Sequence, residues 1–293
     1  RARLDEQKLP ALVAAIRASD RVKDSVKEKA EHELLDHYLL AQDEWLTHLG
    51  VLCIGKREDR ANLGTAPVIQ FIKYDELGQK VNKLTWDDFS LNPMELIEAV
   101  WREVPDFRER YELPDGLYRQ NVPAYDEIVV RELLVNALVH RPYTQRGDIF
   151  LNLHPDRLEV VNPGLLPLGV TPSNILHTTV RRNDHMARLF HDLKLMEREG
   201  SGFDKIYEVL LSQGRPAPDL IEEHDRVQIT VRRRILKPEV IDFIAKADQT
   251  YQLTQRERIA LGLLAQHDAL TARELIAVLE LLTVEALQPW FSR

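Results

Sequence analysis

Cysteine is nearly absent from this chain: Cys53 is the single cysteine among 293 residues. One cysteine excludes an internal disulfide and any zinc site built from cysteines, and it is typical of a reducing compartment such as the cytosol. Long apolar runs are also missing, since none approaches the roughly 18 residues that cross a bilayer. The N-terminus lacks a secretory apolar region. We therefore expect a cytoplasmic protein with no membrane partner.

Positive charge is in deficit, with 39 lysines and arginines against 47 acidic residues and a formal net charge of −8. This balance excludes a protein whose whole surface binds nucleic acid, although it leaves room for a local basic patch. The hydrophobic fraction of 44% is enough for a buried core, and the length allows about two domains. The chain begins at Arg1 and ends within a helical pattern, so we expect a fragment of a longer protein.

The first part of the chain mixes helical and strand patterns. Alternating residues on both sides of Leu77-Gly78 predict a hairpin, and Asn92-Pro93 is typical of a capped helix start. Residues 50–56 match the spacing of a phosphate-binding loop, but Arg57 follows where serine or threonine is needed. A strand that ends in a turn is the better interpretation. The expected elements are helices at about 4–17 and 24–47, a strand at 51–54, strands within 66–76 and 79–89, and a helix from 92 toward 110.

The middle of the chain predicts one sandwich of helices and strands. A predicted hairpin at 148–154 and 156–162 is followed by a long irregular segment, 165–181. The predicted fold class is therefore α+β, with an α/β sandwich at its centre. The other expected elements are helices at about 127–141, 184–196 and 203–213 and a strand at 225–235, and the expected domains are residues 1–115, 116–237 and 238–293.

Three short helices are predicted within residues 253–293, each opened by a threonine cap. They resemble a helix-turn-helix of the winged type without its wing. The third helix, 282–293, would be the recognition helix, yet Arg293 is its only cation, whereas recognition helices usually bring cations and amides to DNA. The sequence therefore leaves three interpretations: a DNA-binding module, a module that contacts another protein, and a truncated module.

A polar stripe runs along the most apolar helix. Glu132, Asn136 and His140 interrupt residues 127–141 at a spacing of four. Successive positions at this spacing drift by only about 40°, so the three side chains form one line on a buried cylinder. Burying a carboxylate and an amide without partners costs several kcal/mol, so the stripe is expected to face an enclosed ligand cavity. The alternative is a set of core polar groups bonded to neighbouring backbone.

The stripe belongs to a set of motifs that resembles a known fold. Glu132-x-x-x-Asn136, the turn Asn162-Pro163-Gly164 and the helix start Gly200-Ser201-Gly202 resemble, in order, the three boxes of the Bergerat (GHKL) ATP-binding fold. More closely, residues 46–56, 131–143, 157–167 and 181–206 are similar to bacterial AlbA/Schlafen-linked transcriptional regulators with a helicase-C-terminal-type ATPase domain. Such regulators carry an N-terminal AlbA-like domain, which we expect to be missing here, and a C-terminal helix-turn-helix.

The resemblance implies a role for each motif. Asn136 would hold a Mg²⁺ that bridges the phosphates of ATP, because magnesium prefers oxygen ligands. Glu132 would orient or deprotonate an attacking water. Asn162 would face the adenine amino group, and Gly164 would allow close backbone approach. The backbone at Gly200 and Gly202 would meet the phosphates at the helix N-terminus. Further candidates for phosphate contact are His140, Arg141, Arg181, Arg182 and Asn183.

Two positions depart from the pattern of this fold. Asn162 stands where the superfamily has an aspartate, and Leu166 stands where it has a second glycine. An amide can accept a hydrogen bond from adenine but lacks the charge that strengthens it. The predicted function is an ATP-binding transcriptional regulator whose nucleotide state biases assembly, including a possible homo-oligomer, or DNA binding. The alternatives are a ligand-free DNA-binding or protein-interaction scaffold and a slow, weak ATPase.

Overall fold

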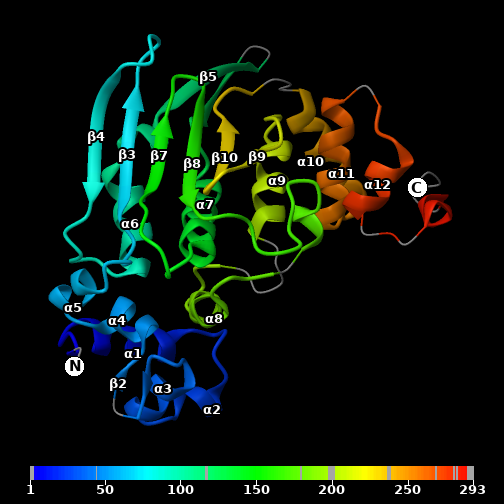
Figure 1. Ribbon diagram of the computed structural model, residues 1–293. Helices are drawn as coiled ribbons and strands as arrows, with labels where there is room; N and C mark the ends of the chain where they lie inside the picture. The colour runs from blue at the N-terminus through cyan, green and yellow to red at the C-terminus, as the bar shows by residue number, and fades with distance from the viewer. Residues whose placement is uncertain are drawn as a thin grey trace.

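A six-stranded mixed sheet forms the centre of the protein (Figure 1). The computed structural model describes residues 3–43, 45–115, 118–178, 180–196, 202–235, 239–267, 269–279, 281 and 283–288. The strand order is β4-β3-β7-β8-β10-β9, and neighbours are antiparallel except β3 and β7, which are parallel. The strands are β3 (Ile69–Tyr74), β4 (Lys80–Trp86), β7 (Ile149–Leu153), β8 (Arg157–Pro163), β9 (Asp219–Glu223) and β10 (Arg226–Arg232).

Helices cover one face of this sheet. Alternate strand residues such as Phe71, Leu151 and Val160 are buried there and join a single core with α6 (Pro93–Glu103) and α7 (Glu127–His140). Helix α9 (Gly202–Ser212) lies beside α7 and adds to the same core. Because every second residue of these strands is buried, the sequences of β3, β7 and β8 largely alternate between apolar and polar residues, as strands do. The α+β fold class predicted from the sequence is confirmed, with a mixed sheet at its centre.

A smaller helical unit at the N-terminus has its own core (Figure 1). Its apolar cluster includes Leu12, Ile16 and Leu34, and Leu189 of α8 (Asp184–Asp192) completes it. The N-terminal unit therefore packs on the segment that precedes α9. It contains α1 (Lys8–Ala18), α2 (Asp24–Lys27), α3 (Glu31–His37), β1 (Ala41–Gln42), β2 (Trp45–Leu46), α4 (His48–Ile54) and α5 (Arg57–Asn62).

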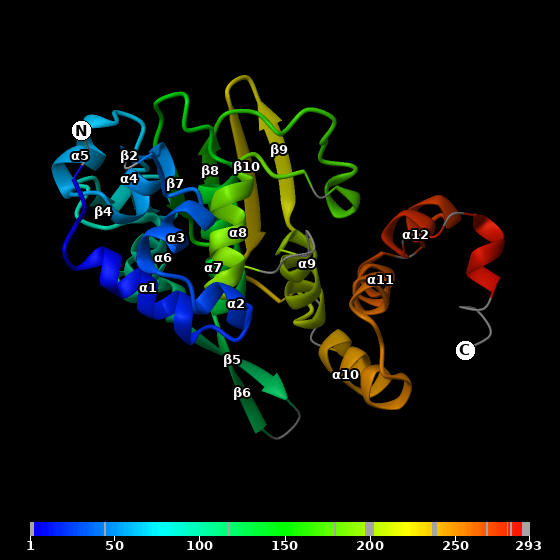
Figure 2. The ribbon, with the colours of Figure 1, turned by 90° about the horizontal axis from the view of Figure 1, so that it is seen from below.

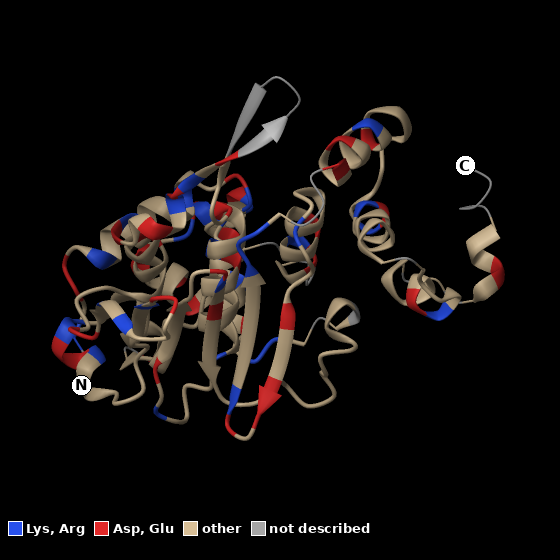
Figure 3. Cartoon of the chain, turned by 90° about the horizontal axis from the view of Figure 1, so that it is seen from above, with Lys and Arg blue, Asp and Glu red and all other residues tan. Residues whose placement is uncertain are grey.

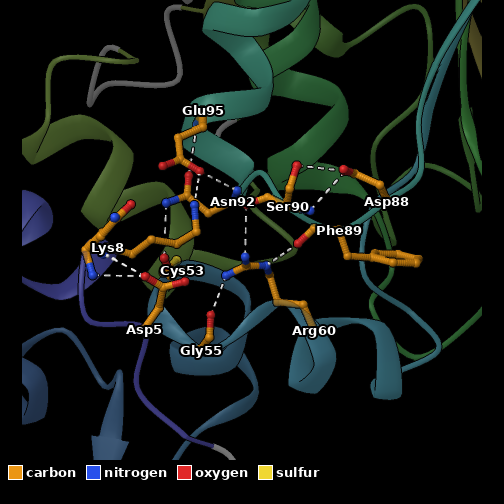
Figure 4. Close-up of polar contacts among 11 residues, drawn as sticks. Asp5, Lys8, Cys53, Gly55, Arg60, Asp88, Phe89, Ser90, Asn92 and Glu95 are labelled. Atoms are coloured by element: carbon orange, nitrogen blue, oxygen red, sulfur yellow. Dashed lines mark hydrogen bonds and ion pairs between the residues drawn. The ribbon is translucent and has the colours of Figure 1, made fainter.

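The buried Arg60 joins this unit to the rest of the protein (Figure 4). Its guanidinium donates to the carbonyl oxygens of Gly55, Phe89 and Ser90. Nearby, Asn92 caps α6 by accepting from the amide of Glu95 at 2.9 Å. Burial lowers the pKa of Arg60, but the group stays charged at neutral pH because its ordinary pKa is very high. The loop before α6 is thus held by a cation that has no contact with bulk water.

Two sequence predictions in this unit are wrong. Residues 24–47 do not form one helix, because Leu39 and Asp43 adopt positive φ angles of 51° and 48°, which end helical geometry. Residues 51–54 are helical in α4 rather than a strand, since Thr47 caps the helix by accepting from the amide of Gly50 at 3.0 Å. A short, fully buried apolar run has no periodicity that separates a strand from a helix.

Most later elements follow the sequence predictions. The hairpins β3–β4 and β7–β8, the cap at Asn92 and helix α7 are confirmed. Helix α6 ends at Glu103 instead of continuing toward Arg110, because a proline follows at 105. The strand β9 and a further hairpin were not predicted. That hairpin is formed by β5 (Arg110–Asp115) and β6 (Tyr118–Pro123) after a short 3-10 helix, η1 (Pro105–Arg108).

The C-terminal helices pack beside α9, far from the N-terminal unit (Figure 2). Helix α11 lies so close to α9 that a Cβ atom at Gly262 would fall 2.5 Å from the Cβ of Leu211. Half of the predicted third helix, residues 282 and 289–293, lies outside the described residues, and the described half contains a 3-10 turn. Within the described residues, no helix has the length and hydrophobicity to span a membrane. The elements are α10 (Glu239–Tyr251), α11 (Gln255–Gln266), α12 (Ala272–Leu279) and η3 (Val284–Leu287).

Candidate functional site

The polar stripe of α7 begins one turn after a well-capped helix start. Asp126 caps α7 by accepting from the amide of Ile128 at 2.9 Å. Along the stripe, Glu132 is buried with 8% of its surface exposed, whereas Asn136 and His140 are half-buried. The surrounding positions of α7, such as Leu134 and Leu138, are fully buried in the core. The stripe therefore leads from the interior of the protein to a partly accessible end.

A cavity of about 100 Å³ lies beside this stripe. Its walls come from α7, from β8 and β10 of the sheet, from the start of α9, and from residues 165–178, which we call the lid. Most of the wall is apolar, and this composition suits the flat face of an organic ring. The polar side chains that line the cavity are Asn136, His140, Asn162, Thr178 and Arg181.

Two amide side chains in this wall have buried atoms without a hydrogen-bond partner among the described residues. These atoms are Nδ2 of Asn136, on α7, and Oδ1 of Asn162, at the end of β8. Buried polar atoms are nearly always paired, because leaving one unpaired costs about 1–3 kcal/mol. A bound molecule with its own donors and acceptors would satisfy both. The two amides therefore indicate a ligand with polar groups at two separate points.

Glycines shape two edges of the cavity. Gly164 follows β8 with a φ of +88°, and a Cβ atom there would lie 2.6 Å from Cγ of Pro142, so the turn requires glycine. At the other edge, a Cβ atom on Gly202 would lie 2.8 Å from Oε2 of Glu132 and 3.5 Å from the amide of Asn136. The first turn of α9 thus rests directly on the polar stripe. Gly200, the other predicted glycine, lies outside the described residues.

Gly202→Ala is expected to lower the free energy of unfolding by about 1 kcal/mol. The added methyl group collides with the Glu132 carboxylate, and such overpacking costs about 1–3 kcal/mol, against a gain of about 0.4–1 kcal/mol from a less flexible unfolded chain. Urea denaturation measures the loss. In a Glu132→Ala background the same substitution should cost nothing, since the colliding carboxylate is gone. Equal losses in both backgrounds would contradict this contact.

Positive charge gathers where the stripe meets the lid. Burial lowers the pKa of His140 to about 4, and the nearby Arg182 and Arg181 lower it further in the same direction. The imidazole is therefore neutral at pH 7, and the arginines supply the local positive charge. Arg181 lines the cavity, whereas Arg182 donates to the carbonyl of Leu165 at 2.6 Å, at the beginning of the lid.

Two other predicted phosphate-binding residues contact backbone instead of the cavity. The amide of Asn183 donates to the carbonyl oxygens of Val139 and Arg141, at 2.7 and 2.8 Å, and so closes the C-terminal end of α7. Arg141 is 1% exposed and donates to the carbonyls of Thr65 and Gly147. Both residues position the end of the striped helix. Neither side chain lines the cavity.

Part of the cavity wall was not predicted from the sequence. Val227 and Ile229 of β10 line it, and their alternation in the predicted strand 225–235 was the available signal. Phe203, directly after Gly202, and Met196 also line it, but no sequence pattern distinguishes them from ordinary core residues. Leu166 lies in the wall at the position where the resemblance expects a glycine.

The described residues contain no group of three or more histidine, cysteine or acidic side chains that could hold a metal ion alone. Magnesium does not need such a group, since it is commonly held by one or two protein oxygens together with phosphates and water. Asn136 lines the cavity and can supply one oxygen of that kind, whereas Glu132, one turn earlier on the stripe, is buried and does not line the cavity. The donor set fits a metal that arrives with a phosphorylated ligand.

Comparison with known proteins shows an ATPase-like domain in the middle of the chain. Residues 147–231 match the family model described as "Putative ATP-dependent DNA helicase recG C-terminal", an ATPase-like domain. The whole fold is similar to the crystal structure of the DIP2311 protein from Corynebacterium diphtheriae, with a TM-score of 0.75 and 23% sequence identity over 99% of this chain. The chain spans 59% of the length of that protein. The comparison with curated proteins gave no match. An ATPase-like domain is therefore present, and it contains the β8 side of the cavity.

Proposed function

We propose that this protein binds ATP with Mg²⁺ in the cavity between α7, β8 and the lid. The observation that carries the proposal is the pair of unsatisfied amide atoms of Asn136 and Asn162, which face one cavity within and beside an ATPase-like domain. The apolar wall would hold the base, and Asn162 would contact the base edge by accepting from, or donating to, its ring substituents. Gly164 would let the backbone approach the same edge.

The phosphates would lie toward α9 and the stripe. Gly202 begins an eleven-residue helix, whose N-terminus favours an anion through the helix dipole, and Arg181 supplies positive charge at the cavity. Asn136 would hold Mg²⁺, which neutralises phosphate charge when bound, and Glu132, one turn earlier on α7, would orient or deprotonate the attacking water. Arg182 and Asn183 would act by positioning the lid and the end of α7 rather than by contact with the nucleotide.

A thermal-shift and calorimetric titration of the whole chain tests nucleotide binding. ATP with Mg²⁺ at 100 times its dissociation constant should stabilise the protein by about 2.7 kcal/mol. The same titration with excess EDTA should give a weaker effect, because the metal link between phosphate and stripe is removed. Guanosine triphosphate serves as the comparison for the base. Absence of both heat and stabilisation with any nucleotide would refute the proposal and favour the scaffold.

Slow hydrolysis of ATP is a separate part of the proposal. Glu132→Gln is expected to lower phosphate release by about 100-fold or more while the dissociation constant for ATP changes little, because a general base contributes about 10²–10⁴-fold to rate. Glu127→Gln is the matched control, since Glu127 lies on the same helix but pairs with Arg131 at the surface. A phosphate-release assay with purified protein measures the rate of each variant. No release from the unsubstituted protein would limit the function to binding.

We further propose that nucleotide binding influences DNA binding by the C-terminal helices. The supporting observation is that α11, a capped helix, packs directly on α9, which begins at the cavity, and that α12 packs on α11 and on the 3-10 turn of the lid at residues 175–177. Acidic and basic residues are mixed along α10–α12 (Figure 3), and Arg256 and Arg258 pair with Asp204 and Glu208 of α9. A fluorescence-anisotropy titration with duplex DNA, with and without ATP, tests the proposal. Equal, weak binding in both conditions would leave a protein-contact module.

A further inference from the structure

Arg256, near the start of α11, contacts two segments that line the cavity, the lid and the first turn of α9. Its own side chain does not line the cavity. Its Nη2 atom donates to the carbonyl oxygen of Leu176 at 2.8 Å and lies 3.0 Å from Oδ2 of Asp204. Leu176 belongs to the lid, within the 3-10 turn η2 (Ile175–His177), and Asp204 belongs to the first turn of α9. The Arg256 side chain is 20% exposed and that of Asp204 is 7% exposed. One guanidinium group therefore links the lid to α9 in a poorly hydrated position.

Both partners of Arg256 adjoin the cavity in the sequence. Ile175, directly before Leu176, lines the cavity, and so does Phe203, directly before Asp204. Ile175 and Leu176 also pack against the main core, and Arg182 donates to the carbonyl of Leu165. The other hydrogen bonds of the described lid are short-range, such as that from the amide of Thr171 to Oδ1 of Asn174 at 2.7 Å. Local bonds of this kind move with the lid. The contact with Arg256 instead joins the lid to a different part of the protein.

Helix α11 is anchored to α9 without Arg256. The Nε atom of Arg258 donates to Oε1 of Glu208 at 2.7 Å, and the amide of Gln255 donates to the same carboxylate at 3.2 Å. The close approach at Gly262 and Leu211 adds apolar contact further along both helices. Loss of the Arg256 side chain therefore leaves α11 docked. The contact between Arg256 and the lid can therefore be removed while the contacts between α11 and α9 remain.

We infer that Arg256 is a positioning residue that holds the lid over the cavity, and that it couples the C-terminal helices to ligand entry. The cavity, at about 100 Å³, is smaller than the roughly 300–1,000 Å³ of common small-molecule sites, so the lid must move outward to admit a nucleotide. Outward movement breaks the contact between Arg256 and Leu176. By thermodynamic linkage, a nucleotide that binds the open lid also weakens the contact between α11 and the lid. The coupling between the C-terminal helices and ligand entry rests on the proposed nucleotide binding. The role of Arg256 in holding the lid does not depend on it.

Hydrogen–deuterium exchange on the full chain without nucleotide tests the first half. In Arg256→Ala, amides of residues 171–178 should exchange about tenfold faster, since a charge-assisted hydrogen bond is lost. In the control Arg258→Ala, which removes an α9 contact of the same helix, exchange in 171–178 should stay unchanged. Unchanged exchange in Arg256→Ala would overturn the inference, and so would equal acceleration in both variants. If Arg256→Ala does not fold by circular dichroism, Arg256→Lys keeps the charge beside Asp204, lacks the forked geometry, and should show a smaller acceleration.

An ATP titration with Mg²⁺ tests the second half. Arg256→Ala should bind about five- to tenfold more tightly than the unsubstituted chain, because lid opening no longer breaks this contact. Arg258→Ala should bind with unchanged affinity. Equal affinity in all three proteins, together with faster exchange in Arg256→Ala, would overturn the coupling and leave a structural clamp. If no protein binds ATP, the proposed function fails, and the exchange experiment alone decides the role of Arg256.

Discussion

Asn136→Ala should remove most of the stabilisation that ATP and Mg²⁺ give to the protein. At an ATP concentration 100 times the dissociation constant of the unsubstituted chain, a hundredfold weaker variant retains about 0.4 kcal/mol of the original 2.7 kcal/mol. The physical reason is the loss of the amide oxygen that we propose as a magnesium ligand. The fold itself should change little, since Nδ2 of Asn136 has no hydrogen-bond partner among the described residues to lose. Differential scanning fluorimetry with and without nucleotide measures both quantities.

A matched control for this variant is Asn152→Ala. Asn152 lies on β7, on the face of the sheet opposite the buried Leu151 and Leu153, so the same substitution is made away from the cavity. Its response to ATP should equal that of the unsubstituted chain. If Asn136→Ala and Asn152→Ala are both stabilised fully by ATP, the nucleotide binds elsewhere or Asn136 takes no part.

The largest loss of stability is expected for Arg60→Met. The substitution leaves the carbonyl oxygens of Gly55, Phe89 and Ser90 without their donor in a site where Arg60 is only 2% exposed. Unsatisfied buried groups cost about 1–3 kcal/mol each, and here three carbonyl oxygens lose their donor at once. We therefore expect the free energy of unfolding to fall by about 3–5 kcal/mol, measured by urea denaturation.

Arg57→Met provides the comparison for Arg60→Met. Arg57 lies on the same helix, α5, and also donates to a carbonyl of the neighbouring loop, that of Asp88, at 2.6 Å, but its side chain is exposed. Water replaces this contact, so the loss should stay below about 1 kcal/mol. Similar losses for the two variants would show that burial of Arg60 does not govern its contribution.

Elements with a strong periodic pattern could be predicted from the sequence. The stripe of Glu132, Asn136 and His140 was visible because three polar residues interrupt an apolar helix, and the end of β8 was visible from Asn162-Pro163-Gly164. Helix α4 could not be recognised, since its residues are buried on all sides and carry no period. The edge strand β9 was missed because it is short and mostly exposed, with little alternation to detect.

The surroundings of the site depend on contacts that no local pattern contains. Asn183 and Arg182 were candidates for phosphate contact because of the resemblance to the ATP-binding fold, but their backbone partners depend on how the lid and α7 meet. Likewise, Arg256 reaches Leu176 only because α11 docks on α9. These partners are distant in sequence, so a reading of neighbouring residues cannot reveal them. Tertiary packing decides which polar residues contact the cavity and which support it.

The parallel pairing of β3 with β7 has a consequence for the order in which the protein forms. Ile69 pairs with Ile149, and the chain between them includes β4, the β5–β6 hairpin, α6 and α7. Contacts between such distant residues slow folding, because a long loop must close before they are made. During synthesis, one backbone edge of β3 therefore stays without a partner strand until β7 leaves the ribosome. A nascent chain halted before residue 149 should aggregate or recruit a chaperone at this unfinished edge.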